Sequence, residues 1–252
     1  MASLNPLDWS GIANDASSFA ATIIRLGGGI SSSGAGSPPP RLLELYDYEG
    51  CPYCRKVRER LCELDLDVLV LPVAHGSSRR ADLAQLGGRV QVPYLVDPNT
   101  GVALYESEDI VAYLDRRYGT NGRTWGLRTF PLVNTVDSYL ASAVRLARGT
   151  RVVPALGAAR RPVSRLELYN IEGSPYCRKV REALSELDLE HVVRNVPKGS
   201  PKREAFRNLA GKVQVPYLVD PNSSEALFES DDIVAYLYER YGPRAAGNRV
   251  AR

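Results

Sequence analysis

The 252-residue sequence predicts an α/β protein made of two tandem copies of one small domain. Residues 43–119 align with residues 166–242 without a gap, and 49 of these 77 positions are identical. Within each copy, short runs of alternating or continuous apolar residues, typical of strands, are separated by segments with apolar residues at helical spacing. Two domains also suit the length of the chain.

Composition narrows the class of protein. The chain has 32 Lys and Arg against 29 Asp and Glu, a net charge of +3, so its charge does not favour nucleic acid as a partner. No apolar run reaches the ~18 residues of a membrane span. Four cysteines are too few for a disulfide framework and suit a reducing compartment. We therefore expect a soluble protein.

The repeat divides the chain into five parts. We predict an N-terminal helix and flexible linker at 1–40, a first domain at 41–119, a helical linker at 120–163, a second domain at 164–242 and a tail at 243–252. Residues 18–26 and 138–146 have similar apolar spacing, typical of a helix that leads each domain. Either these helices belong to the repeat, or they are two unrelated linker helices, since short helical patterns arise easily.

The first copy begins with a strand, a helix and a second strand. Residues 43–46 alternate apolar and polar, which predicts a short strand. Gly50 supplies a turn, and Pro52 suits the first turn of a helix because its missing N–H costs nothing there. Residues 68–73 form a nearly continuous apolar run, as in a strand covered on both sides. A polar, glycine-punctuated helical segment follows.

Two strands and a helix complete the copy. Residues 93–96 and 103–105 predict strands joined through the turn sequence Asp97-Pro98-Asn99. Ser107 begins the last helix, with an acidic residue in the first turn and Ile110 and Leu114 on its apolar side. The second copy repeats this order.

Cys51-Pro52-Tyr53-Cys54 is the stretch where two thiols have the spacing that redox chemistry needs. A thiol at the start of a helix lies near free N–H groups and the positive end of the helix dipole, which favour the thiolate and lower its pKa. Cys54 follows one turn later, where it can attack a mixed disulfide at Cys51. A lone C-x-x-C can also be half of a zinc site, but a second pair is missing and both histidines fall in the variable part of the repeat. We expect no metal.

Three motifs now carry a family resemblance: C-P-Y-C after a strand, Val92-Pro93 before the third strand, and Glu106-Ser107 at the start of the last helix. They resemble the thioredoxin-fold domain shared by glutaredoxins and the N-terminal half of glutathione transferases. The resemblance covers both copies, about three fifths of the chain. C-P-Y-C is the glutaredoxin form and Glu-Ser the transferase form. The chain is therefore similar to the intermediate group that includes omega-type transferases and membrane-associated prostaglandin E synthase type 2.

The resemblance implies thioredoxin-like domains and glutathione as a cosubstrate. It assigns glutathione binding to Tyr53, Val92, Pro93, Glu106 and Ser107. The Val92-Pro93 bond is expected to be cis, with the backbone of Val92 holding the cysteinyl part of glutathione. The alternative is an ordinary trans proline at a strand start. Glu106 and Ser107 are expected to bind the γ-glutamyl end, and the alternative is a plain helix cap.

The second copy keeps these motifs but has serine in place of the first cysteine. Its matching residues are Ser174, Cys177, Val215, Pro216, Glu229 and Ser230. It resembles a site that holds glutathione without exchanging it. In several transferase classes a matching serine donates a hydrogen bond to the glutathione thiolate, so conjugation is an alternative. Full transferases, however, carry a large helical domain that the linker and tail leave little room for. Cys62, Ser185 in the copy, is interpreted most simply as a helix residue, and a redox role is the minor alternative.

We predict a glutathione-dependent thiol–disulfide oxidoreductase of glutaredoxin type. Cys51 attacks, Cys54 resolves or is dispensable, and the second domain binds glutathione or stabilises the first, against which it packs. The expected partners are glutathione, glutathionylated proteins and small disulfides. The alternatives are a glutathione transferase or isomerase, a non-catalytic glutathione-binding or redox-sensing module, and an iron–sulfur cluster shared between Cys51 and glutathione. Resemblance to two-domain proteins of photosynthetic organisms adds the plastid stroma to the cytoplasm as a predicted compartment.

Overall fold

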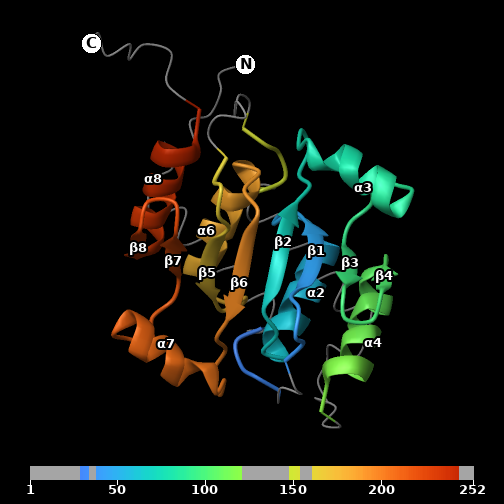
Figure 1. The fold of residues 1–252 in the computed structure, drawn as a ribbon, viewed down its shortest axis with the longest axis horizontal. Coiled ribbons are helices and arrows are strands. Elements are labelled where there is room, and N and C mark those ends of the chain that lie inside the picture. The colour runs from blue at the N-terminus through green and yellow to red at the C-terminus, as the bar shows by residue number, and fades with distance from the viewer. Residues whose placement is uncertain (1–28, 34–37, 121–147, 154–160, 244–252) are drawn as a thin grey trace.

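A computed structural model describes residues 29–33, 38–120, 148–153 and 161–243. The predicted leading helices at 18–26 and 138–146 lie outside these residues, as does the predicted tail beyond residue 243. We refer to residues 43–119 as the first unit and residues 166–242 as the second unit. Figure 1 shows the two units side by side.

Both units have the same order of elements. In the first these are β1 (Leu43–Asp47), α2 (Pro52–Glu63), β2 (Val68–Pro72), α3 (Arg79–Gly87), β3 (Tyr94–Asp97), β4 (Val102–Leu104) and α4 (Ser107–Tyr118). In the second they are β5 (Leu166–Asn170), α6 (Pro175–Glu186), β6 (His191–Asn195), α7 (Lys202–Ala210), β7 (Tyr217–Asp220), β8 (Glu225–Phe228) and α8 (Ser230–Tyr241). The predicted elements are present, with ends shifted by a residue.

Each unit has a thioredoxin-like fold, as predicted. β1 pairs parallel with β2 and antiparallel with β3, which pairs antiparallel with β4. Side chains of a strand alternate between the two faces of the sheet. Leu43 and Leu45 therefore pack with residues of α2 and α4, whereas Tyr46 packs with Leu83 of α3 on the other face. The second unit repeats this arrangement, with the ring of Tyr169 stacked on Phe206 of α7 at 4.5 Å.

The two sheets join into one, which the sequence does not predict. β2 pairs antiparallel with β6, and the eight strands run in the order β4-β3-β1-β2-β6-β5-β7-β8 (Figure 1). β2 and β6 would otherwise each present an unpaired edge, which proteins usually cover. Val193 of β6 belongs to the buried core of the first unit. The described parts of the linkers also cross over, because residue 31 pairs with Lys198 and His75 pairs with residue 151.

A group of buried charges joins the units on the face covered by α2 and α6. Four residues form a closed ring of alternating charge, which we call the charge ring: Arg58, Glu49, Arg181 and Glu172. Each neighbouring pair has a nitrogen–oxygen distance of 3.0 to 3.2 Å, and all four side chains are 3 to 5 % exposed. Removing one partner of such a buried pair typically costs about 3–5 kcal/mol because it leaves an uncompensated charge. Among the described residues, no helix is long and apolar enough to cross a membrane.

Candidate thiol site

Cys51 is the N-cap residue of α2. Its backbone is extended (φ −75°, ψ 121°), Pro52 begins the helix, and the sulfur accepts a hydrogen bond from the backbone N–H of Cys54 at 3.3 Å. A hydrogen bond with the Cys54 thiol and others with backbone N–H groups outweigh the effect of burial and lower the pKa of Cys51. The charge of Arg58 acts in the same direction. The start of α2 therefore favours a thiolate at Cys51.

Cys54 lies one turn into α2 and has no exposed surface. Burial raises the pKa of Cys54 well above its ordinary value, and its interaction with the Cys51 sulfur raises it further. The two thiols are thus unequal, because Cys51 ionises first and Cys54 keeps its proton. The negative charge at Cys51 contributes to the raised pKa of Cys54, and this contribution is lost when Cys51 enters a disulfide.

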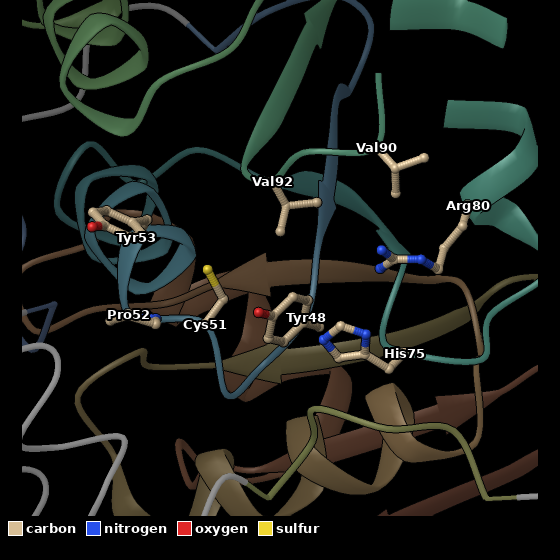
Figure 2. A pocket seen from close by; sticks show the side chains of 8 residues that line it. All are labelled: Tyr48, Cys51, Pro52, Tyr53, His75, Arg80, Val90 and Val92. Atoms are coloured by element: carbon tan, nitrogen blue, oxygen red, sulfur yellow. The ribbon is translucent and has the colours of Figure 1, made fainter. Parts of the chain in front are cut away.

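A cavity of about 350 Å³ lies beside Cys51. Figure 2 shows the Cys51 sulfur directed toward it, between Tyr53, Tyr48 and Val92. Eight of the described residues line it: Tyr48, Cys51, Pro52, Tyr53, His75, Arg80, Val90 and Val92. They come from the loop after β1, the start of α2, the segment between β2 and α3, the first turn of α3 and the segment before β3.

Tyr48, His75 and Arg80 are cavity residues that the sequence interpretation missed. Burial raises the pKa of the Tyr48 hydroxyl, and the charge of Cys51 and a hydrogen bond to it add to this effect. The Tyr48 and His75 rings lie 6.0 Å apart, and Nη1 of Arg80 donates to the carbonyl of Val73 at 3.0 Å. One signal was present in the sequence, because Tyr48 and His75 are among the positions that differ between the copies. Variation at position 75 argues against a zinc ligand there but not against a place in this cavity.

The remaining predicted residues fall in two groups. Val92 and Tyr53 line the cavity, and the bond between Val92 and Pro93 is cis, as expected. Glu106 and Ser107 begin α4 outside the set of lining residues. Oε1 of Glu106 accepts a hydrogen bond from Gln91 at 2.7 Å, and Gln91 lies between the lining residues at 90 and 92. Glu106 is therefore beside the cavity, with its carboxylate exposed.

With this geometry in place, comparison with known proteins identifies the family. The model for the glutathione S-transferase N-terminal domain matches residues 45–122 and 168–245, together more than half of the chain. The chain belongs to this family. Each match contains one thioredoxin-like unit, so the glutathione S-transferase N-terminal domain is present twice.

Two similar proteins carry the same family name. The glutathione S-transferase-like protein tpcF of Aspergillus fumigatus is 36 % identical over 72 residues, which are 29 % of this chain and 32 % of tpcF. The chain therefore matches about a third of that relative's length. The trimeric glutathione transferase TDR1 of Leishmania aligns with 84 % of this chain and 70 % of its own, at 17 % identity and a TM-score of 0.28.

The second glutathione S-transferase N-terminal domain keeps the backbone of the site and changes its chemistry. Ser174 is the N-cap of α6, and its hydroxyl accepts the N–H of Cys177 at 3.3 Å, as the sulfur of Cys51 does in the first domain. Burial raises the pKa of Cys177. Val215-Pro216 is again cis, and Glu229 again accepts from a glutamine before Ser230 begins α8. The site of the second domain therefore has the same N-cap, cis-proline and glutamate geometry but no nucleophilic thiol.

Cys62 is part of the contact between the domains. Its sulfur contacts the carbonyl oxygen of Gly29 at 3.1 Å and accepts the N–H of Glu172 at 3.4 Å, and burial raises its pKa. These contacts give Cys62, a residue of α2 as predicted, a structural role between the domains. Among the described residues, no group of three or more His, Cys, Asp or Glu is placed to hold a metal ion.

Proposed function

We propose that this protein is a glutathione-dependent thiol–disulfide oxidoreductase with catalysis in the first unit. The observation that carries the proposal is the pairing of Cys51, at the start of α2 with a lowered pKa, with the cavity onto which its sulfur opens. A thiolate that is both stabilised and reachable is what nucleophilic attack on a disulfide requires.

The reaction proceeds by two thiol–disulfide exchanges. The Cys51 thiolate attacks the glutathione sulfur of a glutathionylated substrate, the substrate leaves as a thiolate, and a Cys51–glutathione disulfide forms. A second glutathione thiolate then attacks the glutathione sulfur of this disulfide, which frees Cys51 and yields glutathione disulfide. In the alternative dithiol route, the Cys54 thiolate attacks Cys51 and releases glutathione. Complete burial of Cys54 favours the first route.

The cavity offers groups for each part of a glutathione molecule. We assign the cysteinyl part to the backbone of Val92, a residue that lines the cavity, and the γ-glutamyl end to Glu106 and the N–H groups at the start of α4. Arg80 and His75, on the side of the cavity away from Tyr53, supply donors and positive charge for the glycyl carboxylate (Figure 2). A volume of about 350 Å³ is within the usual range of small-ligand pockets.

Glutathione-dependent reduction of a β-mercaptoethanol mixed disulfide tests the proposal. We expect Cys51→Ser to abolish activity and Cys54→Ser to retain most of it. Cys177→Ser, which changes the matching position of the second unit, is the control and should have wild-type activity. A wild-type protein that binds glutathione without reducing the disulfide contradicts the proposal. Equal loss in Cys51→Ser and Cys54→Ser would instead establish the dithiol route.

A second candidate is glutathione conjugation or isomerisation at the second unit. It is favoured by Ser174, whose hydroxyl lies at the start of α6 where a glutathione thiolate would be stabilised. Conjugation of an electrophile that survives Cys51→Ser and disappears in Ser174→Ala would support this candidate. The opposite pattern assigns all glutathione chemistry to the first unit.

A further inference from the structure

The loop that carries Cys51 is held from one side by the second unit. Arg181 of α6 donates two hydrogen bonds to the carboxylate of Glu49, from Nε at 3.0 Å and Nη2 at 3.1 Å. The backbone N–H of Glu49 donates to the hydroxyl of Ser185 at 3.4 Å. Gly149 (φ +71°) lies so close that a Cβ there would be 2.8 Å from the Cβ of Glu49. This side of the loop is therefore fixed.

The wall of the cavity at His75 is held in the same way. The N–H of His75 donates to the carbonyl of Thr150 at 2.8 Å, and the N–H of Val152 donates to the carbonyl of His75 at 2.9 Å. These residues precede the second unit and connect directly to Gly149. The loop with Cys51 and the segment with His75 thus both contact chain outside the first unit.

The two units contribute matching residues to the charge ring but differ at the residue that begins the first helix. The charge ring contains the same residue types from each: Arg58 and Glu49 match Arg181 and Glu172. In the second unit Asn170 replaces Asp47, yet its side chain accepts the hydrogen bond of its arginine at the same 2.6 Å. The second unit has therefore retained its half of the contact, although its own helix start carries serine in place of the nucleophile.

We propose that Arg181 is a positioning residue for Cys51, and that the second unit serves the first as the scaffold of its thiol site through the Arg181–Glu49 pair. Glu49 lies two residues before Cys51, so a paired carboxylate fixes the loop and keeps the sulfur at the N–H groups of α2. The positive charge of Arg181 also offsets the carboxylate of Glu49, which without Arg181 keeps Arg58 as its partner in the charge ring. A less compensated negative charge at Glu49 opposes a thiolate at Cys51. This inference rests on the proposed function of Cys51 and extends it.

The groups that act on Cys51 directly come from its own loop and from α2. They are Tyr48 of the loop, and the backbone N–H of Tyr53 with Cys54 and Arg58 of α2. His75, before α3, and Arg80, in α3, line the same cavity. Arg181 reaches Cys51 through Glu49. A substitution at Arg181 leaves every one of these groups in the chain, so a change at Cys51 then reports the contacts of Arg181 in the charge ring, with Glu49 directly and with Arg58 through Glu172.

The test is the rate of Cys51 alkylation by iodoacetamide across pH, measured in the full chain by mass spectrometry of the Cys51 peptide. We expect Arg181→Gln to raise the pKa of Cys51 by about one unit and to slow alkylation at pH 7 by up to about tenfold. Arg194→Gln is the matched control, because it breaks the contact of Arg194 with Asp67 between the units (3.2 Å) at the opposite end of β2. Arg194→Gln should leave the dependence of the Cys51 alkylation rate on pH unchanged.

A second variant keeps the test decisive if Arg181→Gln does not fold. Arg181→Lys preserves the charge but cannot make two parallel hydrogen bonds, so we expect a smaller rise in the pKa of Cys51. A folded variant of either kind with the wild-type profile overturns the proposal, as does an equal shift in Arg194→Gln. Because alkylation needs no glutathione, this result stands apart from the disulfide-reduction assay, whose failure would concern the proposed function alone.

Discussion

Tyr48 is the residue that most distinguishes the thiol site of the first unit. Its hydroxyl faces the Cys51 sulfur in Figure 2, and the matching position in the second unit is Ile171. A hydroxyl donor stabilises the thiolate more than the thiol. The second unit thus lacks both the nucleophilic cysteine and the tyrosine, because it has Ser174 at the helix start and Ile171 three residues earlier.

We therefore expect Tyr48→Phe to raise the pKa of Cys51. Loss of one hydrogen bond to the charged sulfur predicts a rise of roughly one unit, since such a bond contributes about 1.5 kcal/mol or more. The thiolate absorbance at 240 nm, followed against pH in the Cys54→Ser background, measures it. Tyr46→Phe, two residues earlier, is the control. An unchanged pKa in Tyr48→Phe would show that backbone donors alone stabilise the thiolate.

The sequence predicted the thiol pair, its position at a helix start and the cis bond before β3. These follow from local patterns: a proline after a cysteine, and a family motif. The cavity wall was not predictable in this way. Tyr48, His75 and Arg80 come from separate segments and meet only in the folded unit, so no spacing in the sequence marks them as a group.

At the scale of elements, a buried carboxylate ties the end of β3 to α4. Oδ2 of Asp97 accepts hydrogen bonds from the hydroxyls of Tyr113 and Tyr118, and Oδ1 accepts the N–H of Asn99 at 2.8 Å. Burial alone would raise the pKa of Asp97, but these hydrogen bonds outweigh it and lower the pKa to about 2. Asp220 repeats the arrangement with Tyr236 and Tyr241.

This carboxylate predicts part of the acid unfolding. Because the folded pKa of Asp97 lies below its unfolded value, its contribution is present above pH ~4 and is lost as pH falls toward 2. We expect Asp97→Asn to be less stable than the wild type at pH 6, and the difference to shrink between pH 4 and 2. Urea unfolding at several pH values measures it. Asp109→Asn, at an exposed site on α4, is the control, and a constant difference for Asp97→Asn would contradict the assignment.

At the scale of the whole molecule, the two units share one sheet. Repeat and motif predicted two thioredoxin-like domains that pack together, but not the pairing of β2 with β6. Antiparallel pairing between distant segments leaves no local pattern, and β2 reads equally as an inner strand of a single domain. The charge ring could not be predicted from the sequence, because burial of each charge depends on partners from the other unit. The domain boundaries at 41 and 164 stay predictions.

A shared sheet predicts that the units unfold together. Buried cysteines report each unit: Cys54 for the first and Cys177 for the second. Their alkylation in increasing urea should follow one transition. Val193 lies in β6 but belongs to the core of the first unit. Val193→Ala should therefore lower the free energy of unfolding measured at Cys54 and at Cys177 by the same amount, about 2 kcal/mol. Separate midpoints for Cys54 and Cys177 would show that the sheet is not a cooperative unit.

The most direct test of the account is where glutathione attaches. We would expose the Cys54→Ser protein to glutathione disulfide and locate the adduct by peptide mass spectrometry. The thiolate at the start of α2 and the cavity beside it predict a mixed disulfide at Cys51, forming faster as pH rises through the lowered pKa of that thiol, with Cys62 and Cys177 unmodified. Absence of an adduct at Cys51 in the folded protein, or attachment at Cys177 instead, would contradict the central claim that the first unit carries the glutathione-reactive thiol.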